Sequence, residues 1–244
     1  MGGAHVGRRG GKVVNPGIEP RSAASPRART GLFRAALLFA LAFAPGAVVL
    51  PQEAPTPAAS AAPADRAWSG DLESYLYLPE DDAFLMPILR ADRGSMHLEG
   101  RYQYEDRETA SLWLGFTLEA GKSLQLEATP MAGVVFGRTN GFAPGLELTL
   151  AWKSLELYGE SEYVFDLEGR EGDYFYMWSE LGWQARPWLT LGLSTQRTRL
   201  YRSELTIERG LFVAVTRGPV TLKAYGFNLD GEAPFAIVAL GVDF

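Results

Sequence analysis

Glutamate residues recur at every second position in several segments of this chain, which places them on one face of an extended backbone. In the segment LELYGESEYVFD, Glu156, Glu160 and Glu162 alternate with the apolar Leu155 and Leu157. The same alternation in other segments gives a set of seven glutamates on the polar face: Glu99, Glu127, Glu147, Glu156, Glu160, Glu162 and Glu180. A passage lined by carboxylates concentrates cations and repels anions. This face therefore has the chemistry of a conduit for small cationic or neutral solutes.

Two basic residues, Arg101 and Lys223, fall on the same polar face. The alternation leaves two interpretations open. In the first, the acids line a water-filled passage. In the second, the acids pair with these bases and with Tyr or Gln in a filled interior that conducts nothing. Aromatic residues on the polar face, such as Trp113, Trp178 and Tyr225, would fill much of a narrow interior. We favour the first interpretation and keep the second as its alternative.

The sequence offers one candidate for nucleophilic catalysis. His97 is the only histidine after residue 5, and Ser95 lies two residues before it. A hydrolase needs a base within hydrogen-bond reach of its nucleophile and a third group that orients the base, and none is identifiable here. We therefore assign no catalytic residue, and a lipid hydrolase stays a remote alternative. The acidic segments 79–82 and 168–173 lack fixed ligand spacing. We expect no metal site and no cofactor.

Three arginines, Arg197, Arg199 and Arg209, have the opposite parity and flank the polar segment 201–205. Arginine binds phosphate through two parallel hydrogen bonds, so these residues are candidates for contact with lipopolysaccharide phosphates. The alternative is a set of salt bridges with Glu204 and Glu208, or a bulge that turns the arginines to the other face.

Strands must position all of these residues, because the dominant signal after residue 68 is a period of two. Short polar turns alternate with longer polar connections along the whole segment. Outer-membrane barrels show this alternation, with short periplasmic turns and longer outer loops. The pattern predicts these twelve strands: 68–78, 83–90, 94–105, 109–119, 123–136, 145–153, 155–166, 174–185, 188–199, 206–217, 220–228 and 235–244. Ten strands remain as the alternative if 68–92 stays outside the wall, because Pro87 cannot donate to a strand ladder.

The N-terminal quarter differs in composition from this body. Residues 1–50 contain an Arg-rich region followed by an apolar run from Ala35 to Ala44, as in a Sec-type signal peptide. The charged region is overlong for a signal peptide, which favours a true start downstream of Met1. Residues 51–67 form a Pro/Ala-rich segment that we expect to be a disordered linker. The sequence therefore predicts a signal peptide, a linker and one barrel domain at 68–244.

The charge balance excludes some partners. Residues 1–67 carry 8 of the 23 Lys and Arg but only 3 of the 29 Asp and Glu, so the remaining body is strongly acidic. An acidic body argues against nucleic acid as a partner, because phosphate backbones require a basic surface. The chain contains no Cys, which excludes disulfides, thiol catalysis and a lipid anchor on cysteine.

The chain ends on an alternating strand, FAIVALGVDF, whose last residue is Phe244. This ending resembles the assembly signal of small bacterial outer-membrane β-barrel proteins. The segments LMPILRADRG, HLEGRYQYED, LELYGESEYVFD and QRTR are similar to a family of such barrels that no catalytic motif or ligand defines. The resemblance implies an outer-membrane location and contact with the barrel-assembly machinery and periplasmic chaperones during biogenesis. It implies no substrate.

We therefore predict an all-β protein, a transmembrane antiparallel up-and-down β-barrel of about twelve strands. Its expected function is a narrow porin with an acidic lumen. A non-conducting structural or surface-interaction barrel is the alternative. Its expected partners are outer-membrane lipid and lipopolysaccharide, and the sequence leaves its oligomeric state open.

Overall fold

The computed structural model describes residues 67–79, 82–200, 206–231 and 233–244, with the side chains of residues 199 and 200 outside the description. The predicted signal peptide at 1–50 and all but the last residue of the predicted linker lie outside these residues. In the described part of the chain, no helix is long and apolar enough to cross a membrane.

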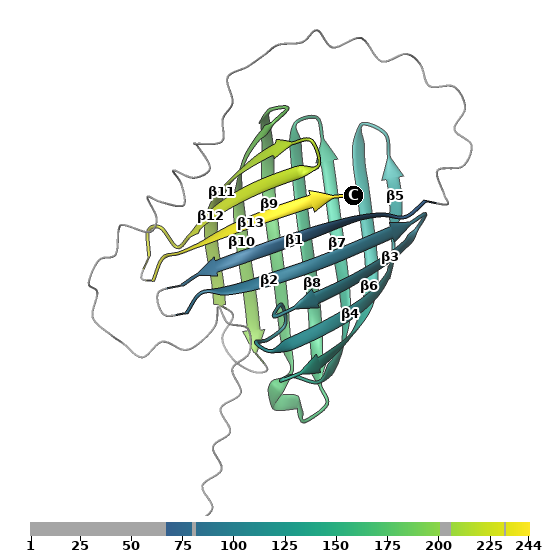
Figure 1. The fold of residues 1–244 in the computed structure, drawn as a ribbon, viewed down its shortest axis with the longest axis vertical. Helices are drawn as coiled ribbons and strands as arrows, with labels where there is room; N and C mark the ends of the chain where they lie inside the picture. Colours follow the sequence, from purple (N-terminus) through teal and green to yellow (C-terminus); the bar gives the residue numbers. More distant parts are fainter. Residues whose placement is uncertain (1–66, 80–81, 201–205, 232) are drawn as a thin grey trace, which may run out of the picture.

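Thirteen strands and one short 3-10 helix make up the fold (Figure 1). The strands are β1 (Ser69–Leu78), β2 (Phe84–Arg93), β3 (Met96–Tyr102), β4 (Thr109–Phe116), β5 (Leu118–Gly121), β6 (Leu124–Gly137), β7 (Gly141–Trp152), β8 (Leu155–Asp166), β9 (Tyr174–Arg186), β10 (Leu189–Leu200), β11 (Thr206–Arg217), β12 (Val220–Phe227) and β13 (Phe235–Asp243). The helix η2 (Arg170–Gly172) lies between β8 and β9.

The strands form one closed antiparallel sheet. Neighbouring strands pair in the order β4-β3-β2-β1-β13-β12-β11-β10-β9-β8-β7-β6-β5, and β4 also pairs with β6. Figure 1 shows the seam at which the last strand, β13, lies beside the first, β1. Thr109 pairs with Gly137 and Leu118 with Ala128 in one continuous register, so β4 and β5 are two segments of a single wall strand. The barrel therefore has twelve wall strands, as the sequence predicts.

The ten-strand alternative is wrong. β1 pairs with both β13 and β2, so the segment that this alternative left outside is part of the wall. Pro87 lies inside β2, and the ladder between β2 and β3 begins at Ile88, directly after it. Pro87 pairs with Ser74 of β1, but β3 on its other side makes no ladder pair with it, so a proline is tolerated at this position.

The two ends of the barrel differ. At one end, two-residue turns such as 94–95 and 153–154 connect the strands, and Ser69 and Asp243 also lie there. We call this the turn end. Longer connections such as 103–108 and 167–173 lie at the other end, the loop end.

Side chains alternate between the two faces of the wall. Leu112 and Leu114 of β4 are each 58% exposed, whereas Trp113 between them is 3% exposed and faces inward. Exposed Leu, Val, Phe and Trp continue this outer face around the barrel. A closed barrel has no free sheet edge, and an unbroken apolar outer face is the surface that lipid requires. The wall is therefore built to span a membrane.

Two predicted boundaries are wrong. The segment 137–145, predicted to be a loop, contains only a short connection, because β7 already begins at Gly141. Gly141, Ala143 and Gly145 face inward, and their small size hid the alternation in the sequence. The predicted strands 83–90 and 94–105 leave a turn between them at 91–93. In the structure this turn lies at 94–95, because β2 continues to Arg93.

The orientation of Tyr104 also differs from the prediction. In the predicted strand 94–105, Glu99 and Arg101 have the inward parity, so Tyr104 has the outward parity. The strand β3 ends at Tyr102, and Gln103 adopts a positive φ of 59°. This reversal turns Tyr104 inward, where it is 4% exposed.

Candidate functional site: the barrel interior

Near the turn end, part of the inner face of the wall is open to solvent. Glu119, Glu127 and Glu156 have inward parity, yet all three are exposed, as are the inward Gln125 and Gln184. In the described strand order β5 pairs only with β6, so Glu119 and Glu127 lie where the wall extends beyond β3 at this end. We call this solvent-exposed stretch of the inner face the turn-end vestibule.

The charges that face the turn-end vestibule are carboxylates. Asp71, Asp92 and Asp243 share its inner face with the three glutamates and are half-buried or exposed. Arg186 lies beside it, but it pairs across a bulge with the outward Leu189. Water-exposed acids of one sign, enclosed by a low-dielectric wall, concentrate cations.

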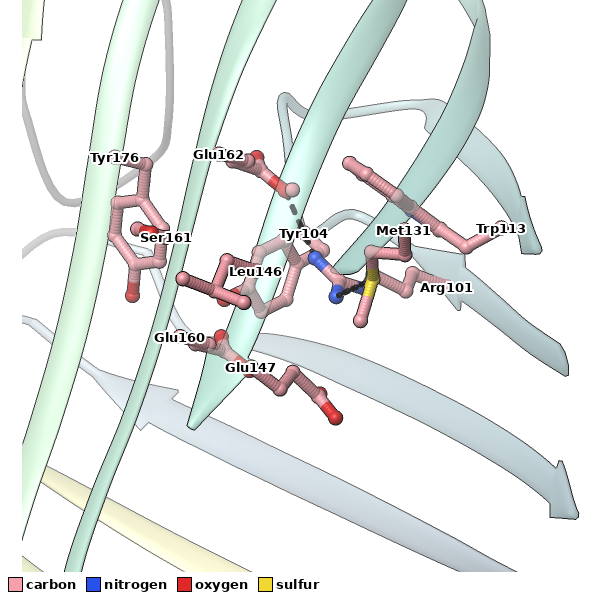
Figure 2. Close-up of a pocket in the computed structure, with 11 residues that line it drawn as sticks. Arg101, Tyr104, Trp113, Met131, Leu146, Glu147, Glu160, Ser161, Glu162 and Tyr176 are labelled. Atoms are coloured by element: carbon pink, nitrogen blue, oxygen red, sulfur yellow. Dashed lines mark hydrogen bonds and ion pairs between the residues drawn. The ribbon is translucent and has the colours of Figure 1, made fainter. Parts of the chain in front are cut away.

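Arg101 is the centre of a buried network at mid-height (Figure 2). Its guanidinium donates to Glu99 and to Glu162, each at 2.9 Å. It also lies over the rings of Tyr104 and Trp113, 4.3 and 4.6 Å from their centroids. The residues around this network leave no room for a water molecule. Arg101 therefore crosslinks β3, β8 and β4 through the interior.

Arg90 of β2 extends the network across the barrel. Its guanidinium lies 3.1 Å from Asp71, 3.4 Å from Glu73 and 3.4 Å from Glu99. It also lies 3.8 Å from Glu147. One guanidinium thus ties β2 to three other strands of the wall, β1, β3 and β7.

Lys223 of β12 completes the network on the far side. Its ammonium group lies 3.1 Å from Glu73 and 3.9 Å from Glu180. Glu180 also accepts hydrogen bonds from Trp178 Nε1 at 2.9 Å and from the Tyr225 hydroxyl at 2.7 Å. We call Arg90, Arg101, Lys223 and the acids that they contact the central belt. Each acid of the belt has a basic or aromatic donor, as burial of a charge requires.

Aromatic side chains fill the loop half of the interior. The rings of Phe227 and Phe235 stack at 4.9 Å, and those of Tyr77 and Phe84 at 4.6 Å. The connected set of buried aromatics consists of Tyr75, Tyr77, Phe84, Tyr104, Trp113, Tyr174, Tyr176, Trp178, Phe212, Tyr225, Phe227 and Phe235. We call this set the loop-end plug. It closes the interior above the central belt.

The segment 103–108 folds into the plug rather than over the rim. Glu105 is fully buried, and its carboxylate accepts hydrogen bonds from Ser111 and from Trp113 Nε1. Its carbonyl accepts a hydrogen bond from the Tyr174 hydroxyl at 3.0 Å. Burial raises the pKa of Glu105, although nearby Arg101 and the bond from Ser111 act in the opposite direction.

His97 joins the network through the predicted Glu99 and through Asp92, which the sequence did not indicate. Its Nδ1 lies 2.7 Å from Asp92, its cross-strand partner, and its Nε2 lies 3.8 Å from Glu99. Ser95 lies in the exposed turn before β3 and has no hydrogen bond with His97. Ligand atoms of His97, Glu99 and Glu147 lie within 4.8 Å of one another. Two guanidinium groups already contact Glu99, so a metal ion there would compete with them.

The structure places the seven predicted glutamates and both predicted bases on the inner face, but in two groups. Glu127 and Glu156 lie in the open turn-end vestibule, whereas the other five lie at or near the central belt. Sequence reasoning missed Arg90, Asp71, Glu73 and Glu105. The outward Leu85 and Leu89 of β2 could have revealed the inward parity of Arg90.

The remaining predicted residues lie on the outer face. Arg197 and Arg209 are exposed on the neighbouring strands β10 and β11. Arg199 follows on β10, with its side chain outside the described part of the chain. Phe244 is 71% exposed, and its backbone N–H and C=O pair with Gly70 at 2.8 and 2.9 Å.

Comparison with known proteins identifies the fold. No family model matches the chain, and no curated protein matches it in sequence. A solved structure of KdgM porin is similar at a TM-score of 0.55 and 10% identity, covering 72% of this chain and 99% of that one. A second, of KdgM porin in complex with disordered oligogalacturonate, gives a TM-score of 0.51 at 9% identity, with 72% and 99% covered. The chain has the fold of a porin. At these identities, the likeness extends to the fold alone.

Proposed function

We propose that this protein is a porin of the bacterial outer membrane that passes small cationic or neutral solutes. The observation that carries this proposal is the turn-end vestibule, whose inward charges are carboxylates open to solvent. The central belt, which shares Asp71 with the vestibule, adds five further acids. In total, Asp71, Glu73, Glu99, Glu147, Glu162 and Glu180 face Arg90, Arg101 and Lys223. Both levels of the interior favour positive charge.

The membrane location follows from the wall. Its apolar outer face meets lipid, and the short turns together with both barrel termini match the periplasmic side of such barrels. Because the first and last strands begin and end at the turn end, both barrel termini lie on the periplasmic side without any further membrane-spanning segment. We therefore place the turn-end vestibule on the periplasmic side and the loop-end plug outside.

The proposed solute differs from the one bound in the KdgM complex. An oligogalacturonate carries carboxylates along its length, and the carboxylates of the turn-end vestibule would repel it. Cationic and neutral solutes meet no such barrier. Acidic oligosaccharides are therefore the class that this interior should exclude.

The reversal potential of the refolded barrel in a planar bilayer, measured under a KCl gradient, tests this proposal. We expect a cation preference that falls in the triple variant E119Q/E127Q/E156Q. The matched control E108Q/E168Q/E171Q removes the same charge from the loop end and should leave the preference unchanged. An anion preference of the unmodified barrel, or no effect of the vestibule variant, would contradict the proposal.

A second candidate function, a non-conducting barrel, is favoured by the loop-end plug. The buried rings and the segment 103–108 close the loop half. For conduction, these groups must move aside. Trp178 and Tyr225 meet edge to face at 5.4 Å, so the variant W178A/Y225A should enlarge the passage and raise the single-channel current. A folded barrel that carries no current as either unmodified protein or variant would establish the second candidate.

A further inference from the structure

The outer face of the wall carries charge only at its two rims. Among the strand side chains that the structure describes, every charged residue on this face is an arginine: Arg93, Arg186 and Arg217 at the turn end and Arg197 and Arg209 at the loop end. An exposed charge at mid-depth in lipid would cost about 2–4 kcal/mol, and far less at the interface. The rim positions therefore agree with a membrane-embedded wall, but they do not explain why two arginines gather at the loop end of β10 and β11.

Arg197 and Arg209 form one cluster. Arg197 pairs with Ile207, and Thr195 pairs with Arg209, so Arg197 and Arg209 are diagonal neighbours on the outer face. Diagonal neighbours lie on the order of 7–8 Å apart, which lets both guanidinium groups reach one anion. The backbone of Arg199 follows two positions later in β10, and its side chain lies outside the description.

The register places the cluster at the level of the lipid headgroups. Arg199 pairs with Phe175, which belongs to a loop-end band of aromatics with Tyr163 and Phe165. On the other side, the Asn228 N–H donates to the Arg209 carbonyl at 2.8 Å, directly after the end of β12. Aromatic bands of this kind mark the boundary between hydrocarbon and headgroups.

No carboxylate of the described residues neutralises Arg197 or Arg209. Glu208, the nearest acid in sequence, has the inward parity and accepts a hydrogen bond from Gln196 at 2.8 Å. The bulge that would turn these arginines inward is also absent from the described register of β10 and β11. Glu204, the other acid of the predicted alternative, lies outside the described residues. Among the described residues, the two guanidinium groups have no acidic partner, and they face the membrane.

We infer that this cluster binds the phosphate groups of a phosphorylated glycolipid in the outer leaflet. Arginine, rather than lysine, suits this chemistry because its planar donors match two phosphate oxygens at once. Directly toward the membrane centre, Leu193 and Leu211 pair across the strands, and each is 53% exposed. These leucines contact the acyl chains, while the arginines hold the headgroup.

The inference depends on the proposed outer-membrane location but not on conduction. Native mass spectrometry of the refolded barrel in detergent, with diphosphorylated lipid A as the probe, tests it. We expect R197Q/R209Q to weaken lipid A binding by roughly tenfold or more, the loss expected when charge-assisted hydrogen bonds are removed. The matched control R93Q/R217Q removes two outward arginines from the turn end and should leave the binding unchanged.

Two further arms identify the ligand. Lipid A without phosphates should bind the unmodified barrel as weakly as lipid A binds R197Q/R209Q, and inorganic phosphate should not displace bound lipid A. Displacement by inorganic phosphate would assign the site to a free anion and overturn the lipid. Equal binding to R197Q/R209Q and the unmodified barrel would overturn the site itself. Neither result depends on whether the barrel conducts.

Discussion

Arg101 offers the sharpest test of the interior. The substitution Arg101→Met keeps an unbranched apolar stem but removes the guanidinium charge that faces Glu99 and Glu162. The side chain of Arg101 is 3% exposed, and those of the two acids are 0% and 3% exposed. Removing one partner from a buried ion pair costs about 3–5 kcal/mol, because the other charge stays buried without compensation. Loss of the contacts with Tyr104 and Trp113 adds about 1 kcal/mol.

We therefore expect R101M to lower the free energy of unfolding by about 4–6 kcal/mol, measured by urea titration of the barrel in lipid vesicles. The triple variant R101M/E99Q/E162Q should recover most of this loss, because neutral groups can replace a buried ion pair at little cost. Arg138→Met is the control, since the side chain of Arg138 is 35% exposed and its partner Asp106, 3.8 Å away, keeps its hydrogen bonds from the Arg107 N–H and the Thr139 hydroxyl. It should cost under about 1 kcal/mol. If R101M costs no more than R138M, water reaches Arg101 and the described closure of the interior is wrong.

Three other predictions address the plug, the packing of the wall and assembly. First, the raised pKa of Glu105 means that its neutral form stabilises the plug below the ordinary glutamate pKa, and that this stability is lost as pH rises through the raised pKa. Hydrogen exchange of segment 103–108 should therefore quicken, beyond its intrinsic pH dependence, as pH rises, and E105Q should abolish this excess; the same pH profile in E105Q would contradict the assignment. Second, a Cβ at Gly133 would lie 2.5 Å from the ring of Trp113, so Gly133→Ala should cost about 1–3 kcal/mol of unfolding free energy. Gly100→Ala, whose Cβ would have its nearest contact at 3.6 Å, should cost little, and equal losses would disprove close packing of Trp113. Third, because the Phe244 side chain is 71% exposed, Phe244→Ala should barely alter folded stability yet lower the amount of assembled barrel in cells. Unchanged assembly would remove Phe244 as the signal for the assembly machinery.

The wall could be predicted from the sequence because lipid imposes a strict rule on it. Residues such as Leu112 and Leu114 must alternate with inward residues, and this period of two, together with the alternation of short and long connections, favours twelve strands over ten. Strand boundaries are less predictable where the inward residue is small. Gly141 and Ala143 carry little side-chain information, so the sequence predicts a loop where β7 begins.

The division of the interior could not be predicted. Parity places Glu127 and Glu162 on the same inner face, but only the register shows that one lies in open solvent and the other against Arg101. The inward fold of segment 103–108 has a positive φ at both of its ends, at Gln103 and Glu108, and neither position carries a glycine that would mark it in the sequence. Contacts across the lumen, such as those of Arg90, arise from closure of the barrel and leave no local sequence pattern.

The central claim is that residues 68–244 form a closed barrel in the outer membrane. Electrophoresis of the outer-membrane fraction, with and without boiling in detergent, tests this claim most directly. A closed barrel should stay folded in detergent without boiling and run faster than the boiled, unfolded chain. A protein that fractionates as soluble without detergent and runs at the same position in both samples would contradict the account.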